Sequence, residues 1–331
     1  MNWEAILENS LRAAFGEFAA IFALAAIGLN VHFGYTGLLN FGQVGFMAVG
    51  AYGIAISVTY FAWSMWVGLA VGIGAAILLA LLLGIPTLRL RADYLAIVTI
   101  AASEIIRFIL RSPSFREYTG GTFGRTQFAR DFYRFNIFDG GERYVFGPIQ
   151  FSGRALWVVV VAWTLVLLVS LLVFLLMRSP WGRVIKAIRE DEDAARSLGK
   201  NVYSYKMQSL ILGGVCGALA GFVMAISTQS VQPDTYSTPI TFFAYVALIL
   251  GGTARIFGPV VGSMIFWMLL AFTDSVLRQG VANGHIPSWL MQGTQVGQVR
   301  FMLVGLGLML LMIFRPQGIF GDKRELALDA R

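Results

Sequence analysis

The sequence predicts an all-α fold, a polytopic helical bundle embedded in a membrane, and three observations support this. The chain of 331 residues is 57% hydrophobic and 13% charged, whereas soluble domains carry about 25% charged residues. Charge-free runs such as Leu156–Met177 and Leu69–Leu83 approach or exceed the roughly 18 residues that cross a bilayer as a helix. Much of the net charge of +7 lies in one short loop and the C-terminal tail.

The apolar runs define about nine expected spans, with eight to ten as the range. Residues 1–10 have no positive n-region and the first span lacks a small-residue cleavage site, so we expect no removed signal peptide. No soluble domain separates the spans, so we expect a single transmembrane domain over residues 1–331. The expected spans are 12–31, 44–62, 65–85, 92–110, 155–177, 207–228, 239–255, 257–277 and 298–314.

The segment 36–53 allows a different interpretation from a plain span. It is dense in glycine and contains Asn40 and Gln43. Non-helical backbone is tolerated at membrane depth where protein or a water-filled cavity surrounds it. A broken or re-entrant helix that lines a cavity is therefore an alternative here, and it would change the number of spans.

The loops predict the orientation of the chain. Seven basic residues lie in the loop 178–206, and further basic residues lie in the tail 315–331. Short cytoplasmic loops are enriched in lysine and arginine, so both segments are expected in the cytoplasm, together with the C-terminus. The opposite loop, 111–153, mixes aromatic residues, glycines and charges. We expect it to form an ordered extracytoplasmic cap.

The loop 178–206 carries the signals of a short helix. The acidic run Asp191–Asp193 suits a helix N-terminus, Ala194 and Ala195 favour helix, and Gly199 suits the position just after the C-terminus. Val184, Ile188, Ala195 and Leu198 recur at roughly helical spacing. They would form one small apolar face, away from Arg183, Lys186, Arg189 and Glu190, that could dock on a partner. An ordinary solvated loop whose basic residues only set the topology is an equally good interpretation from the residues alone.

Glycines and amides inside the spans are candidates for a moving seam or a translocation pathway. Gly42, Gly45, Gly251 and Gly252 belong to two glycine-rich stretches. Simple helix packing is about twice as good an explanation for most single glycines. We reserve the pathway interpretation for Asn40 and Gln43 beside them, because polar side chains in a span need partners.

Other polar residues in the spans have simpler interpretations. Glu104 and Arg107 are three residues apart, so they can pair on one helical face. Asp274 fits a membrane interface, and most of the tryptophans fit interfacial belts. Structural roles are therefore expected for these residues, with no part in substrate contact.

Several kinds of chemistry have no support in the sequence. Cys216 is the only cysteine, and His32 and His285 match no metal-ligand spacing. No serine, histidine and acid arrangement suggests a hydrolase. The chain has no G-x-x-x-x-G-K-[ST] loop that could hold ATP phosphates. We therefore expect neither enzyme activity, nor a metal site, nor a cofactor bound by this chain, and we attribute the positive charge to topology, not to nucleic acid.

The residues Asp193–Gly199 (DAARSLG) resemble the E-A-A-x-x-x-G motif of bacterial ABC importer permeases, with Asp193 where Glu is frequent. The whole chain resembles the branched-chain amino-acid permeases of the LivH/LivM kind, and its length and order are closer to LivM. Two departures are Gln43, where His is common, and a long segment 116–148. The stretches that carry the resemblance are Gly34–Gln43, Gly45–Tyr52, 178–206, Gly251–Ala254, Gly258–Gly262 and Phe314–Gly318.

This resemblance implies a multi-pass permease subunit of an ATP-driven importer in the bacterial cytoplasmic (inner) membrane. It implies partners: a homologous second permease subunit, two ABC ATPase subunits that hydrolyse the ATP, an extracytoplasmic solute-binding protein and membrane lipid. The implied cargo is a branched-chain amino acid, moved by alternating access. The implied ATPase coupling loop contains Glu190, Asp193, Ala194, Ala195 and Gly199.

Two alternatives remain open. Permeases for urea or short amides resemble the same family, and Gln43 is compatible with such a solute. A secondary transporter driven by an ion gradient is an alternative of another class, and it would need carboxylates or broken-helix carbonyls at mid-depth. Glu104 is weak support for it.

Overall fold

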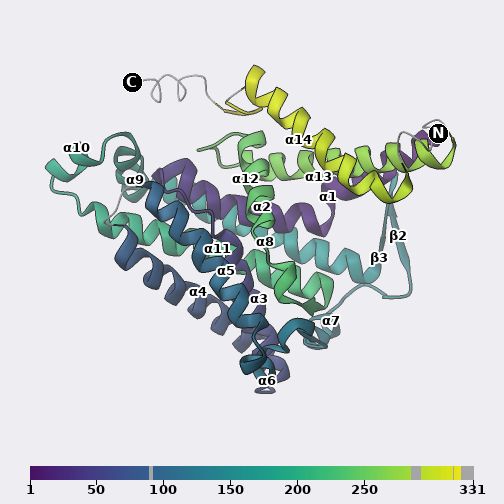
Figure 1. Cartoon of the computed structure of the whole chain (residues 1–331), viewed down its shortest axis with the longest axis horizontal. Helices are drawn as coiled ribbons and strands as arrows, with labels where there is room; N and C mark the ends of the chain where they lie inside the picture. Colours follow the sequence, from purple (N-terminus) through teal and green to yellow (C-terminus); the bar gives the residue numbers. More distant parts are fainter. Residues whose placement is uncertain (89–91, 285–291, 316, 322–331) are drawn as a thin grey trace.

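The structure, a computed structural model, describes residues 1–88, 92–284, 292–315 and 317–321. It is a bundle of long helices (Figure 1). The main helices are α1 (Trp3–Phe15), α2 (Glu17–Leu29), the π-helical η1 (Asn30–Tyr35), α3 (Gln43–Thr59), α4 (Met65–Thr87), α5 (Ala92–Arg111), α8 (Gly153–Arg178), α9 (Pro180–Glu190), α10 (Glu192–Ser197), α11 (Val202–Thr228), α12 (Pro239–Gly251), α13 (Gly258–Ala282) and α14 (Val296–Phe314).

The predicted helical membrane bundle is confirmed. Every expected span overlaps one of these helices. Six helical stretches in the described residues are long and apolar enough to cross a membrane: Trp3–Tyr35, Met65–Thr87, Gly153–Arg178, Val202–Thr228, Gly258–Ala282 and Gly293–Phe314. The helix α3 is a shorter apolar helix of 17 residues. The first of these stretches begins earlier than expected, because α1 precedes α2 and the chain bends at Gly16 between them.

The alternative of a broken helix is correct for the segment after η1. Residues 37–42 are irregular, and α3 begins at Gln43. Buried backbone groups need partners, and here one partner is nearby in sequence and the other lies on α5. The backbone N–H of Leu38 donates to His32 O at 2.8 Å, and that of Phe41 donates to Thr99 Oγ1 at 3.1 Å. We call residues 36–43 the break.

The centre of the bundle is the packing of α2 and α3 against α11. The side chains of α2 from Ala19 to Leu29 are almost all buried. The helices approach closely where glycines face one another, so that a Cβ placed on Gly213 of α11 would lie 2.5 Å from Gly28 O of α2. Small residues permit this approach because dispersion contacts, not hydrophobic exclusion, hold helices together in lipid.

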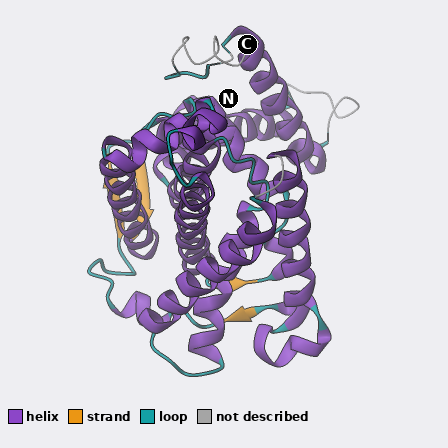
Figure 2. Ribbon diagram, turned by 90° about the vertical axis from the view of Figure 1, so that its left-hand side faces the viewer, coloured by secondary structure: helices purple, strands orange, loops and turns teal. Residues whose placement is uncertain are grey.

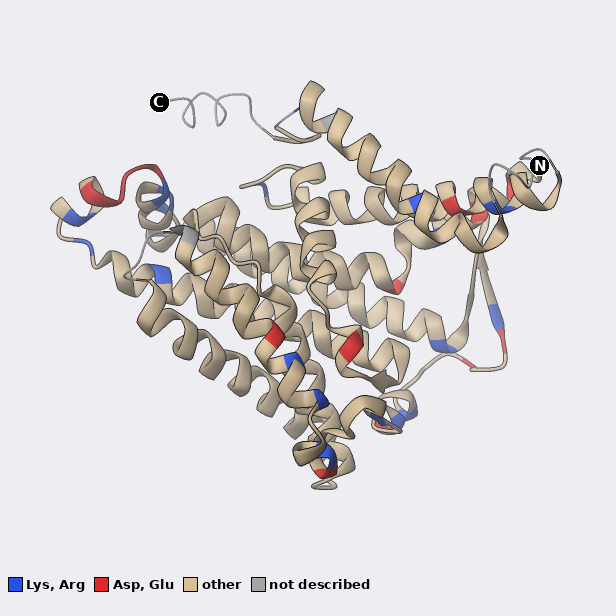
Figure 3. Ribbon diagram, viewed as in Figure 1, with Lys and Arg blue, Asp and Glu red and all other residues tan. Residues whose placement is uncertain are grey.

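Charged side chains gather toward two ends of the molecule (Figure 3). One end carries α9 and α10, and we call it the loop end. The other carries residues 111–153, and we call it the cap end. Of the expected C-terminal tail, residues 317–321 lie at the loop end, where Ile319 N donates to Leu250 O at 3.0 Å. Lys323, Arg324, Arg331 and also His285 lie outside the described residues.

The segment 111–153 is built from short elements. These are η2 (Pro113–Phe115), α6 (Arg116–Thr119), η3 (Gly121–Phe123), β1 (Arg125–Thr126), α7 (Arg130–Arg134), β2 (Arg143–Phe146) and β3 (Ile149–Ser152). The strands β2 and β3 form an antiparallel hairpin, and β1 pairs antiparallel with β4 (Ser230–Val231). The all-α prediction did not include these strands, which are short: β2 and β3 lie at the edge of the bundle and β1 and β4 among its helices (Figure 2). Two more 3-10 turns are η4 (Pro233–Thr235) and η5 (Gly293–Gln295).

Hydrogen bonds fix this segment to the bundle. Tyr133 OH donates to Ile226 O at 3.1 Å, and Trp157 Nε1 donates to Phe132 O at 3.2 Å. Burial raises the pKa of Tyr133, which keeps its phenol neutral and able to donate. The cap end is therefore an ordered structure in which α7 is attached to both α8 and α11.

Candidate functional site

The helix α10 begins and ends as the sequence predicts. The Asp191 carboxylate accepts a hydrogen bond from Ala194 N at 2.9 Å and so caps the N-terminus. At the other end Gly199 has φ +74°, and Lys200 N donates to Ala195 O at 3.3 Å. This is a Schellman closure, and a left-handed residue there is nearly always glycine. The six residues of α10 are thus capped at both ends.

The predicted apolar face is correct for Val184, Ile188 and Ala195, which pack together, but wrong for Leu198. Asp191 has an extended backbone, with φ −153° and ψ 106°, which separates α9 from α10. Ile188 and Ala195 pack inward with Val202, and Val184 lies against them. Leu198 follows the end of α10 and is 79% exposed. The inward residues anchor the loop, and Leu198 is the apolar group that it presents to the outside.

The predicted coupling residues divide into an exposed and a buried group. Glu190, Asp193, Ala194 and Gly199 are exposed, while Ala195 is buried at 4%. Ion pairs brace this surface: Arg196 contacts Glu192 at 2.9 Å and Asp193 at 3.2 Å. Lys206 of α11 also pairs with Glu192. The loop end thus carries a small, rigid and exposed helix.

The helix α9 connects this loop to the break. Lys186 Nζ lies 5.8 Å from the centroid of the Tyr35 ring, within the range of a cation–π contact. A Cβ placed on Gly37 would lie 3.5 Å from Arg189 Cγ. Ile185 of the same helix is fully buried in the core of the bundle. Any displacement of α9 would therefore act directly on the start of the break.

Asn40 and Gln43 form a buried polar cluster with His32, and none of the three side chains is exposed. Asn40 Nδ2 donates to His32 Nδ1 at 3.0 Å and to Gln43 Oε1 at 3.1 Å. Since an amide nitrogen only donates, His32 Nδ1 accepts, and Nε2 carries the proton that it shares with Leu210 O at 3.1 Å. We call these three residues the amide cluster. Sequence reasoning did not include His32, which lies just after the expected span 12–31; the signal was a histidine close to Asn30 at the end of an apolar run.

The amide cluster ties three other helices to the break. Gln43 Nε2 donates to Gly213 O of α11 at 2.9 Å, and Tyr245 OH of α12 donates to Asn40 O at 2.9 Å. The Phe41 contact with Thr99 adds α5. These side chains are satisfied by protein, as buried polar groups in a membrane must be.

The structure divides the predicted pathway glycines between two places. Gly42 and Gly45 lie beside the amide cluster and face Thr99 and Ser103 of α5. Gly251 and Gly252 belong to a second junction between α12 and α13, where Gly252 has φ +107°. Asn30 links this junction to η1, because its amide contacts Arg255 O and Ala254 N at 2.8 Å each.

The expected pair on α5 is present and is part of a larger network. Arg107 contacts Glu104 at 2.7 Å and Asp234 at 3.0 Å. Thr238 Oγ1 donates to Glu104 Oε1 at 2.6 Å. Asp234 and Thr238 lie in the connection between α11 and α12. The pair therefore fastens α5 to that connection, which agrees with the structural role predicted for it.

Comparison with known proteins places this architecture in a family. A profile described as "Branched-chain amino acid transport system / permease component" matches residues 14–314. The chain belongs to this permease family. It is 33% identical over 309 residues to the high-affinity branched-chain amino acid transport system permease protein LivM of Escherichia coli (strain K12), covering 90% of this chain and 67% of that protein.

Two more distant relatives show the range of the family. The probable branched-chain amino acid transport permease protein LivM of Methanocaldococcus jannaschii is 26% identical, and the match covers 92% of this chain and 91% of that protein. The guanosine ABC transporter permease protein NupQ of Bacillus subtilis (strain 168) is 26% identical over 275 residues, which cover 75% of this chain and 81% of NupQ. The matched family region contains the break, the α9–α10 loop and the second glycine junction.

Proposed function

We propose that this permease is a subunit of an ATP-driven importer and translocates branched-chain amino acids. The observation that carries the proposal is the rigid, exposed α10 at the loop end, joined through α9 to the break. A membrane domain without an ATP site of its own needs an exposed element on which an ATPase subunit can dock. Separate ATPase subunits would bind α10 from the cytoplasm of a bacterial cell, with Leu198 entering a pocket on the ATPase.

The mechanism follows from the contacts of α9. A push on α10 moves α9, and α9 presses on Tyr35 and Gly37 at the start of the break. The break is held by hydrogen bonds to α5, α11 and α12, so these helices move with it. Irregular backbone is easier to rearrange than a continuous helix, and alternating access in transporters uses such broken segments.

The proposed cargo follows from the relatives and from the sparse charge of the helices. LivM proteins serve branched-chain amino acid transport by name. We propose that a second, homologous permease subunit completes the pathway, that an extracytoplasmic binding protein delivers the solute, and that Asn40 and Gln43 take part in the pathway with Gly42, Gly45, Gly251 and Gly252. The guanosine relative makes nucleosides the comparison solutes to test.

The test is purification of the tagged chain from its native membranes in mild detergent, followed by reconstitution of the co-purified complex in vesicles. The expected result is recovery of P-loop ATPases and a second permease, and leucine uptake that needs ATP and the binding protein. Guanosine and urea serve as comparison solutes. Uptake that persists without ATP and collapses with the ion gradient would favour a secondary transporter and overturn the proposal, and uptake of guanosine or urea but not leucine would overturn the cargo.

A further inference from the structure

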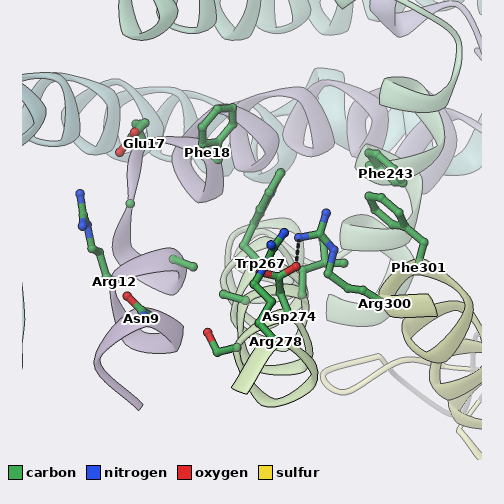
Figure 4. Close-up of a pocket in the computed structure, with 15 residues that line it drawn as sticks. Asn9, Arg12, Glu17, Phe18, Phe243, Trp267, Asp274, Arg278, Arg300 and Phe301 are labelled. Atoms are coloured by element: carbon green, nitrogen blue, oxygen red, sulfur yellow. Dashed lines mark hydrogen bonds and ion pairs between the residues drawn. The ribbon is translucent and has the colours of Figure 1, made fainter. Parts of the chain in front are cut away.

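A pocket of about 500 Å³ lies between α1, α13 and α14, on the cap-end side of the bundle and away from the amide cluster. Figure 4 shows the side chains that line it. Arg12 comes from α1, Glu17 from the start of α2, Asp274 and Arg278 from α13, and Arg300 from α14. Aromatic rings form the rest of its wall.

The charged groups of the pocket are unequal in number. Both oxygens of Asp274 accept hydrogen bonds, Oδ2 from Arg278 Nε at 2.7 Å and Oδ1 from Arg300 Nη1 at 3.1 Å. Glu17 lies in the first turn of α2, where the helix dipole stabilises its charge. Three arginines and two carboxylates thus line the pocket, and two of the arginines, Arg278 and Arg300, share the single carboxylate of Asp274. Each guanidinium offers five N–H donors.

The surplus of donors is visible in individual groups. Arg278 is 62% exposed and bonds to Asp274 through Nε, so its terminal nitrogens have no acceptor among the described residues. Arg12 lies 5.7 Å above the ring of Phe151, which is outside the pocket, and points away from Asp274 (Figure 4). In the wall, Trp267 Nε1 and Arg300 Nε have no acceptor among the described residues. Acceptor oxygens and one negative charge are what the pocket lacks.

The aromatic wall and the apolar rim indicate that a ligand of this pocket also has an apolar part. Phe18 and Trp267 lie 5.3 Å apart, and Phe243 stacks on Phe301 at 5.6 Å. The rim continues into apolar side chains of α14 that face outward, with Phe301 43% and Met302 64% exposed. The pocket therefore opens toward an apolar surface of the bundle, the surface that lipid covers in a membrane protein.

We propose that this pocket binds an anionic membrane phospholipid, with the phosphate at Arg278 and Arg300, which meet at Asp274 (Figure 4), and the acyl chains along Phe301 and the outer side of α14. Arginine matches phosphate oxygens in geometry and charge, and basic pockets between helices bind lipid headgroups. The apolar rim favours a lipid over a free anion. The site is separate from the amide cluster and from the proposed import function.

Native mass spectrometry of the full chain in detergent tests the proposal. The probes are palmitoyl-oleoyl phosphatidylglycerol and the diacylglycerol with the same chains. The expected result is tighter binding of the phospholipid by about ten-fold or more, and a loss of about twenty-five-fold in the variant Arg278→Gln/Arg300→Gln, about five-fold for each arginine. The variant Arg278→Lys/Arg300→Lys keeps the charge and should keep most of the binding.

The matched control is Arg130→Gln, which removes an exposed arginine of α7 elsewhere at the cap end and should leave binding unchanged. Thermal melting verifies that each variant is folded. Equal binding of the two probes, or an unaffected double glutamine variant, would overturn the proposal. Competition by inorganic phosphate at similar strength would identify a free-anion site instead, and displacement of the lipid by leucine would assign the pocket to the transported solute. Both results contradict the lipid proposal.

Discussion

At the scale of single residues, Asn40 carries the most connections of the predicted site. Its side chain makes three hydrogen bonds, to His32, to Gln43 and from Gly42 N. Its carbonyl accepts a fourth from Tyr245. One amide thus holds the irregular backbone of the break and orients the histidine that reaches α11.

The first prediction concerns this amide. Asn40→Leu should lower the free energy of unfolding by about 2 kcal/mol, because three hydrogen bonds disappear at roughly 0.6 kcal/mol or more each and their partners stay buried. Thermal melting in detergent measures the change. Gln208→Leu, which removes an exposed amide bonded to Trp181, is the control and should have little effect. Equal melting temperatures for the two variants would contradict the role assigned to the cluster.

At the scale of elements, the closure of α10 at Gly199 leads to a prediction about coupling. Gly199 has a positive φ and open space around it, so only the backbone restricts a substitution. Gly199→Leu should strain the left-handed turn, displace Leu198 and reduce uptake by about ten-fold or more while the chain still inserts. Gly199→Asn is the control, because asparagine tolerates this conformation. Normal uptake by the leucine variant would remove α10 from the coupling mechanism.

The seam between α2 and α11 leads to a prediction about packing. A Cβ on Gly213 would lie 2.2 Å from His32 Nε2 and 2.5 Å from Gly28 O, so Gly213→Val must push the helices apart. We expect a loss of at least about 2 kcal/mol of stability, measured by melting and by the yield of inserted protein. Gly74→Val on α4 has nothing within 4 Å and should be tolerated. Unchanged stability of Gly213→Val would mean that α2 and α11 are farther apart than the structure indicates.

At the scale of the whole molecule, the two charged ends lead to a prediction about orientation. Cys216 is the only cysteine and is buried at 2%, so the chain gives almost no background with a thiol reagent. An impermeant maleimide should label Val145→Cys, in the β2–β3 hairpin, in intact spheroplasts. It should label Leu198→Cys only in inverted membrane vesicles from which the ATPase subunits have been stripped. The reverse pattern would show that the chain has the opposite orientation in the membrane, in which a cytoplasmic ATPase could not dock on α10.

Local patterns in the sequence predicted much of the architecture. Apolar runs located the helices, because backbone in lipid must satisfy its own hydrogen bonds and a helix does so within one segment. The acidic residues at 191–193 and Gly199 located the ends of α10, because caps are short-range hydrogen bonds. The spacing of Glu104 and Arg107 predicted their ion pair, since both lie on one helical face.

Tertiary structure alone decided what depends on distant parts of the chain. Ala195 packs inward within α10, whereas Leu198 is exposed because α10 ends at Ser197 and Leu198 is the cap residue beyond it. His32 joined Asn40 and Gln43 because α11 supplies the acceptors at Leu210 and Gly213. Arg12, Arg278 and Arg300 share a pocket although they are far apart in sequence. Helical periodicity and capping depend on residues a few positions apart, so the sequence predicts them. A distant hydrogen-bond partner or the wall of a pocket depends on which helices pack against each other, and only the tertiary structure determines this.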